Sequence, residues 1–280
     1  MKVGTQLRRL MLGIAGATFA LPLFVMLSMS VKPDEEIATG HSLSLPHAVF
    51  TGAWVMAWSH ACIGTACDGL SVWFCHSLAI AIPSLTLSLA IGAISAHALL
   101  ERAMASRVIL ALLFLGLLMP PQVTLYPTII LLRYIGLFAS TPGLILVHVI
   151  WGLPFVTLLF KTFFSSLPPE LFRMAEIDGA SFPVVLLKLL VPASLPVIAS
   201  AGILQFTFIW NDYLLGTTFG NSSEFPIMVA LYALASPQYG HTQYNVSMAA
   251  AVIASIPTLV LYFFSWKLLA RGMHGVATKS

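Results

Sequence analysis

Six long apolar segments are the feature of this sequence that most restricts its fold. They cover roughly residues 10–30, 73–99, 108–130, 141–163, 193–214 and 248–270, and each is near the ~20 residues that a helix needs to cross a bilayer. Backbone amides in lipid must be hydrogen-bonded within their own segment, so helices are expected at all six places. The sequence therefore predicts an all-α, polytopic membrane protein with six transmembrane helices.

Composition supports the same class. Hydrophobic residues make up 59% of the chain and charged residues only 8%, whereas soluble domains are about 25% charged. The first segment has one alternative, a cleavable signal peptide, because Ala15, Ala17 and Ala20 are small. Since the apolar core of a signal peptide is usually ~7–15 residues long, we expect a retained first helix.

The third segment is interrupted by Pro120, Pro121 and Pro127. Proline removes a backbone donor and disfavours helix in the residue before it. We expect this segment to break into a helix and an irregular or re-entrant piece.

Lysine and arginine are divided very unequally by six crossings. Eleven of the 13 basic residues fall on one face: Lys2, Arg8, Arg9, Arg102, Arg107, Lys161, Arg173, Lys188, Lys267, Arg271 and Lys279. The other face holds only Lys32 and Arg133. The positive-inside rule makes the eleven-residue face, with both termini, cytoplasmic.

Two long loops, roughly 31–72 and 215–247, then lie on the opposite, external face. The first contains Cys62 and Cys67, which an oxidising compartment would allow to form a small disulfide. Two free or metal-binding thiols are the alternative, although two ligands alone make a poor metal site. We expect no metal site, and a buried structural role for Cys75.

The loop between the fourth and fifth segments, residues 165–192, has clear helix signals. Pro168 and Pro169 suit a first turn, Glu170 favours the positive end of the helix dipole, and Gly179 suits a helix terminus. A second apolar helix is expected from Pro183 to Val191. The domain division expected from these features is residues 1–72 for the first span and external loop, and residues 73–280 for a five-span core carrying this loop.

Several motifs in this loop resemble the cytoplasmic coupling motif of ABC importer permeases, and within them the maltose-type carbohydrate branch. The matching residues are Pro168, Glu170, Leu171, Ala175, Ile177, Asp178, Gly179, Ala180, Pro192 and Pro196. Arg173 and Met174 stand where the family usually has Glu-Ala. Glu170 or Glu176 could supply the missing carboxylate.

Two further stretches resemble the same family. Residues 209–214, Ile-Trp-Asn-Asp-Tyr-Leu, resemble the signature that ends its fifth span, and residues 271–279 resemble its closing Arg-Gly-x-x-x-Gly-Ala-x-Lys. The external stretch from Trp58 to Leu70 is similar to the glucose/mannose subgroup. The resemblance covers nearly the whole chain.

The resemblance implies a subunit of an ATP-driven sugar importer in the bacterial inner membrane. Its expected partners are a second permease subunit, an ATPase dimer on the cytoplasmic side and a periplasmic sugar-binding protein, within membrane lipid and without nucleic acid. The implied ATPase contact comprises Glu170, Leu171, Arg173, Met174, Ala175, Asp178, Gly179 and Ala180. The chain lacks the Gly-x-x-x-x-Gly-Lys-Ser/Thr phosphate loop, so ATP and Mg are expected on the partner, with no cofactor and no catalytic residue here.

Asn211, Asp212 and Tyr213 are candidates for the substrate pathway, because polar side chains near a span are usually functional. Helix capping or packing against the partner subunit is the alternative. An ion-coupled secondary transporter is the main competing function, but it would need carboxylates inside the spans, and only Asp212, near an end, approaches one. A membrane enzyme would need a catalytic cluster, and a structural subunit would not need the coupling motif.

Overall fold

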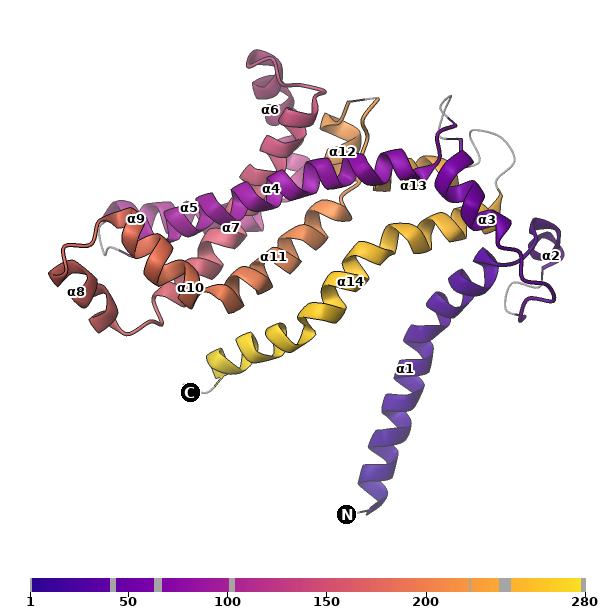
Figure 1. Ribbon diagram of the computed structural model, residues 1–280, viewed down its shortest axis with the longest axis horizontal. Coiled ribbons are helices and arrows are strands. Elements are labelled where there is room, and N and C mark those ends of the chain that lie inside the picture. The colour runs from indigo at the N-terminus through magenta and orange to yellow at the C-terminus, as the bar shows by residue number, and fades with distance from the viewer. Residues whose placement is uncertain are drawn as a thin grey trace. The chain divides into compact units, whose positions relative to one another are not determined.

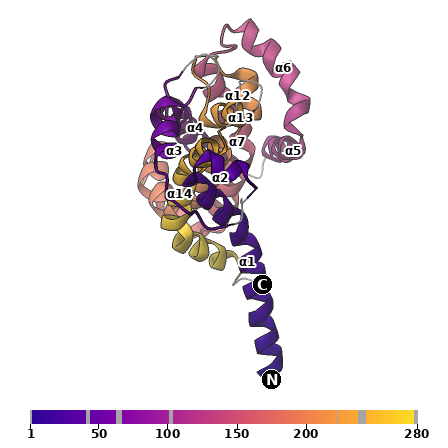
Figure 2. The same cartoon turned by 90° about the vertical axis from the view of Figure 1, so that its right-hand side faces the viewer.

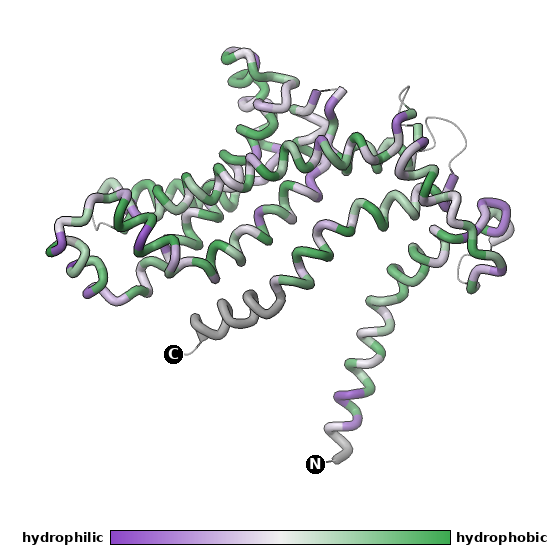
Figure 3. The backbone as a smooth tube through the Cα atoms, in the orientation of Figure 1, coloured by the Kyte–Doolittle hydropathy of each residue, from purple (hydrophilic) through white to green (hydrophobic). Residues whose placement is uncertain are grey.

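The computed structural model describes residues 2–40, 44–62, 67–100, 104–221, 223–236 and 243–277, with the backbone alone for residues 2–4, 176 and 266–277. All regular elements in these ranges are helices, as expected. Four are long and apolar enough to cross a membrane alone: α1 (Lys2–Ser30), α4 (Leu70–Ala98), α7 (Thr141–Phe164) and α14 (Tyr244–Ala277). Hydrophobic residues dominate along these helices (Figure 3).

The third expected span is a bent pair of helices. α5 (Met104–Leu118) and α6 (Pro121–Tyr134) meet at an angle of 109°, and α6 turns away from the line of α5 in both views (Figures 1 and 2). Pro120 has an extended backbone and Pro121 opens the new helix, which is the conformation that consecutive prolines favour. The break was expected, and the second piece is a regular helix, not an irregular segment. The bent pair is either one broken span or the re-entrant arrangement that was the other expectation.

The expected second loop helix and the fifth expected span form another bent pair. A run of short helical pieces, α9 (Phe182–Val184), a π-helical segment (Val185–Leu190) and α10 (Val191–Ala193), meets α11 (Leu195–Trp210) at 79°. α11 has 16 residues, so it begins later and ends earlier than the expected 193–214. The chain therefore has four candidate spans, or six if each bent pair is one span.

Shorter helices fill the connections. They are α2 (Asp34–Ala38), α3 (Gly52–Val55), a π-helical segment (Met56–His60), α8 (Pro169–Ile177), α12 (Leu214–Phe219) and α13 (Ile227–Ala235). The chain forms two compact units, residues 1–75 with 227–256, and residues 76–226 with 257–280. The expected division at residue 72 stays a prediction.

In the first unit, the apolar part of α1 is exposed throughout residues 5–24. The end of α1 is fixed instead by polar contacts. Lys32 is fully buried and its Nζ donates to the Ser44 carbonyl at 2.7 Å, while Asn245 Nδ2 donates to the Lys32 carbonyl at 3.1 Å. These contacts tie the chain after α1 to the start of α14.

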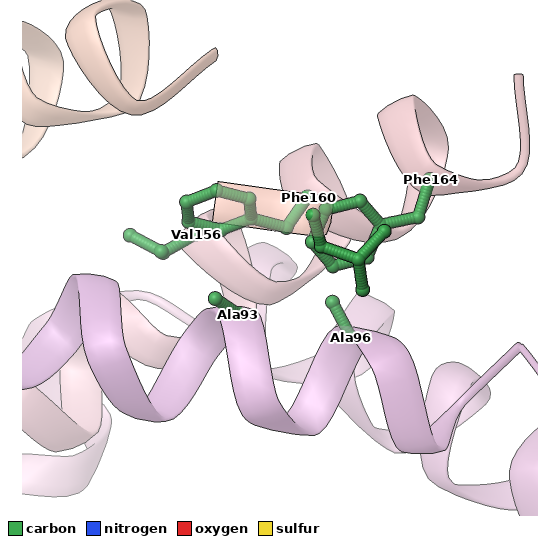
Figure 4. Packing of buried hydrophobic residues seen from close by; sticks show 6 residues of the cluster. Ala93, Ala96, Val156, Phe160 and Phe164 are labelled. Carbon is green, nitrogen blue, oxygen red and sulfur yellow. The ribbon is translucent and has the colours of Figure 1, made fainter. Parts of the chain in front are cut away.

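In the second unit, α4 and α7 pack tightly together. Ala93 and Ala96 of α4 lie against Val156, Phe160 and Phe164 of α7 (Figure 4). Lipid tails are as apolar as these side chains, so van der Waals packing of small against large residues must hold the two helices together. This contact forms the core on which the candidate site is built.

Gly92 allows the closest approach in this contact. A Cβ atom at this position would lie 2.6 Å from Val156 Cγ1, a distance that no packed pair of carbon atoms adopts. Glycine at position 92 is therefore required by the distance between α4 and α7.

Candidate functional site

The expected loop helix is present as α8 (Pro169–Ile177), the two prolines stand at its start, and Glu170 lies in its first turn. Glu170, Arg173, Met174 and Asp178 are exposed, whereas Leu171 and Ala175 are half-buried. Ile177 is 85% exposed and Met174 62%. Met174 therefore lies on the outer face of α8, and Leu171 on the side that packs inward.

Gly179 ends α8 as expected. Its φ is +67°, and the Ala180 amide donates to the Ala175 carbonyl at 2.9 Å. This six-to-one hydrogen bond across a left-handed residue is a Schellman turn, which satisfies a carbonyl that the helix end would leave unpaired. The chain then reverses into the π-helical segment Val185–Leu190. We refer to residues 165–193 as the elbow.

The elbow lies at the end of the second unit where α4 and α7 end and α11 begins (Figure 1). Its inner side is attached to the α4–α7 core, because Leu190 is fully buried there and Phe172 packs against the same cluster. His97, near the end of α4, also contacts both limbs of the elbow. The His97 ring centroid is 5.0 Å from that of Phe182 and 6.4 Å from that of Phe172.

This arrangement has a mechanical consequence. The exposed helix α8 belongs to an elbow that is joined to two long helices through the buried Leu190 and the aromatic contacts of His97. A force applied to the outer face of α8 would therefore reach α4 and α7 through packed side chains. Sequence reasoning did not anticipate the part played by His97, since a lone histidine at a helix end gives no sign of its tertiary neighbours.

The second group of candidate residues lies where α11 ends. Asp212 is mostly buried, with 10% of its side chain exposed. Its Oδ1 accepts from the Leu215 amide at 3.2 Å and its Oδ2 from the Gly216 amide at 2.8 Å. Asp212 therefore caps the first turn of α12, whereas Asn211 and Tyr213 on either side of it are exposed.

A buried polar group stands beside Asp212. His148 of α7 is 1% exposed and its Nε2 lies 3.9 Å from Asp212 Oδ2, which is longer than a hydrogen bond. Gln205 of α11 is buried as well and lies directly against Gly152 of α7, where a Cβ would be 2.0 Å from Gln205 Nε2. Sequence reasoning missed Gln205, although a glutamine inside an apolar segment is itself a signal.

In the external loop, Cys62 and Cys67 are joined by a disulfide, with their Cα atoms 3.8 Å apart. Residues 63–66 between them lie outside the described residues. Gly69 follows with a φ of +70°, and a Cβ atom there would lie 2.3 Å from the Trp58 carbonyl oxygen. The backbone after the disulfide therefore packs closely on the segment before it. Cys75 was expected to be buried, but it is exposed near the start of α4.

Comparison with known proteins gives consistent matches. Residues 88–275 match the family described as binding-protein-dependent transport system inner membrane component. A probable ABC transporter permease protein of Pyrococcus horikoshii is 30% identical over 93% of this chain and 92% of its own length. The xylose/arabinose import permease protein XacI of Haloferax volcanii is 29% identical over 91% of this chain and 87% of its own.

A solved structure has the same fold. A chain of a bacterial ABC transporter involved in the import of the acidic polysaccharide alginate superposes with a TM-score of 0.82 at 20% identity. The match covers 96% of this chain and 97% of the other.

Proposed function

This chain belongs to the family of binding-protein-dependent transport system inner membrane components, and on that premise we propose that it is a permease subunit of an ATP-driven sugar importer. The single observation that carries the proposal is the elbow. It presents an exposed helix, α8, on a base buried against the α4–α7 core. A chain that needed no energy from a partner would have no use for such a contact.

The outer face of the elbow is the proposed contact with an ATPase dimer. Glu170, Arg173 and Asp178 offer charged groups of both signs, and Met174 and Ile177 form an exposed apolar patch between them. Apolar side chains exposed in this way are typical of docking surfaces. The half-buried residues Leu171, Ala175 and Ala180 would set the shape of the contact, and ATP with Mg would bind to the partner.

Six crossings are part of the proposal, and the basic residues favour them. If both bent pairs were re-entrant, leaving four spans, the 13 basic residues would divide nine against four. With six spans they divide eleven against two. The positive-inside rule favours the sharper division, which places the elbow and both termini in the cytoplasm.

A sugar is the proposed substrate class, because the similar protein XacI is a xylose/arabinose import permease protein. A binding protein on the external face would deliver the sugar, and a second permease subunit would form the other half of the pathway. Within this pathway, Asp212 uses both carboxylate oxygens to cap α12. We therefore propose that Asp212 positions its exposed neighbours Asn211 and Tyr213, and that these two contact the sugar.

Ion-coupled transport is disfavoured. Such a transporter binds its coupling ion through carboxylates or unwound carbonyls near the bilayer midplane. No Asp or Glu occurs within residues 70–98, 104–134, 141–164, 182–210 or 244–265. These ranges lack the carboxylates on which proton and sodium coupling usually depend.

The proposal is tested by photo-crosslinking within the natural assembly. A photoreactive amino acid is placed at Ile177, and a matched control at Tyr134, which is 89% exposed at the far end of α6. The tagged protein is purified in mild detergent and its adducts are identified. We expect an ATPase subunit at Ile177 and none at Tyr134, together with a second multi-span chain in the same preparation. Purification as a lone chain, with no ATPase adduct at Ile177, would refute the importer assignment.

A further inference from the structure

A cleft of about 860 Å³ lies between the elbow and the membrane helices. Its walls belong to the second unit and come from the end of α4, the start of α5, the end of α7 and the elbow, including the start of α8. Its polar lining includes Arg107 from α5 and Lys161 from the last turn of α7. Among the residues that the structure describes, no aspartate or glutamate lines it.

Two cations of the cleft could bind an anion. Within the described part of the chain, neither Arg107 nor Lys161 has an ion pair with a carboxylate. Arg107 is exposed and Lys161 is half-buried. Two such cations beside one hollow create a positive potential that favours phosphate.

The rest of the cleft does not suit a small, fully hydrated anion. Leu110, Phe164 and Phe172 contribute apolar walls to it. From Arg107 onward, α5 also continues as an exposed apolar surface, with Val108, Leu112 and Leu115 all more than half exposed. A ligand that has a phosphate at one end and a long hydrocarbon chain at the other would satisfy both parts.

We propose that this cleft binds an anionic phospholipid of the cytoplasmic leaflet. Its phosphate would lie between Arg107 and Lys161, and an acyl chain would follow the exposed face of α5. The proposal rests on the orientation given under Proposed function, which places both cations at the cytoplasmic interface, where anionic lipids and basic pockets between helices meet. Because Phe172 and Ala180 of the elbow also line the cleft, the bound lipid would contact the elbow and stabilise its position against the membrane helices.

The test measures lipid binding to the purified full-length protein, together with whatever subunits remain attached, by native mass spectrometry. Dioleoyl phosphatidylglycerol is titrated against dioleoyl phosphatidylcholine, and inorganic phosphate is added as a competitor. We expect one tightly held phosphatidylglycerol. The R107Q/K161Q variant should bind it about 30-fold more weakly, at about fivefold for each lost charge.

Two control variants separate the site from general effects. R8Q/R9Q removes two charges from the same predicted face but lies outside the cleft, so it should bind phosphatidylglycerol within about twofold of wild type. R107K/K161R keeps both charges and should retain binding, which would attribute the loss in R107Q/K161Q to the missing charges. The measurement does not depend on transport. A negative result for lipid binding would therefore not be confused with failure of the importer assignment.

Three results would overturn the proposal. They are equal affinity of wild type and R107Q/K161Q for phosphatidylglycerol, equal binding of phosphatidylcholine, and complete displacement of the lipid by millimolar inorganic phosphate. The last result would identify a site for a soluble anion instead.

Discussion

Gly179 offers the sharpest test of how the elbow is built. Its φ of +67° lies in the left-handed region, and a Cβ atom added there would meet nothing within 4 Å. The cost of a side chain at this position is therefore purely conformational within the chain. For alanine this cost is about 1–2 kcal/mol, which corresponds to a loss of about 5- to 30-fold in the ratio of ordered to open elbow.

The open space around Gly179 makes the cost independent of side-chain size. Gly179→Ala and Gly179→Leu should destabilise the elbow equally, whereas Gly179→Asn should cost less, because asparagine tolerates the left-handed conformation. Hydrogen exchange of the amides of residues 175–181 measures the opening free energy directly. Gly13→Ala is the matched control, since it also lies in open space but within α1, and it should not change exchange in the elbow.

Sugar uptake in proteoliposomes separates this backbone role from a docking role. If the ATPase lies close to Gly179, the leucine variant should lose uptake that the alanine variant partly keeps, although both change elbow opening equally. Equal exchange in the asparagine and alanine variants would refute the left-handed argument. Normal uptake by the leucine variant would remove Gly179 from the ATPase contact.

Three further predictions concern other parts of the chain. Asp212→Ala removes the acceptor of two α12 amides and should destabilise the protein by about 0.5–2 kcal/mol, with Asp212→Asn costing less, as measured by thermal unfolding in detergent. Gly92→Leu forces α4 away from Val156 and should cost about 1–3 kcal/mol in the same assay. The hydrogen bond from His47, 3.0 Å long, holds the pKa of the Glu36 carboxyl below its usual value, so His47→Ala should raise that pKa, measured by carbon NMR of labelled glutamate.

The sign of the Glu36 effect follows from proton linkage. A lowered carboxyl pKa in the folded state means that the contribution of this pair is present above the ordinary carboxyl pKa and is lost as pH falls through the lowered value. Stability in His47→Ala should therefore depend less on pH in the acidic range. For the Gly92 prediction, Gly202→Ala is the control, since its Cβ would meet only Leu89 at 3.8 Å. A loss of stability there as large as at Gly92 would contradict the close-approach argument.

Local signals in the sequence predicted local structure well. Pro169 and Gly179 mark the start and the end of α8, because proline and glycine act through their own backbone geometry. Their effect can therefore be predicted without knowledge of tertiary contacts. Pro120 and Pro121 likewise marked the break between α5 and α6. A separate loop helix ending near Pro192 was also expected, but the bend of 79° that follows it at Ser194 was not. Hydropathy indicates which residues can face lipid, but it does not indicate the direction of a helix axis, so the bend could not be predicted from it.

The parts of the site that sequence could not supply are tertiary. Asp212 drew attention as a polar residue near a span, but only the fold shows that its oxygens are engaged by α12. Arg107 and Lys161 were counted among the cytoplasmic basic residues, yet nothing in their spacing indicates that they share one cleft. The contacts of His97 with Phe172 and Phe182 are tertiary in the same way, since the packing of α4 on α7 brings His97 to the elbow.

The exposure of α1 bears on how its sequence can drift. Lipid requires only length and apolarity of a helix, and residues 5–24 touch little else within the chain. We expect saturation mutagenesis to find that most exchanges among leucine, isoleucine, valine and phenylalanine are neutral there. In α7 we expect few such exchanges to be tolerated. Any intolerance that recurs every three to four residues along α1 would then trace the footprint of a neighbouring subunit.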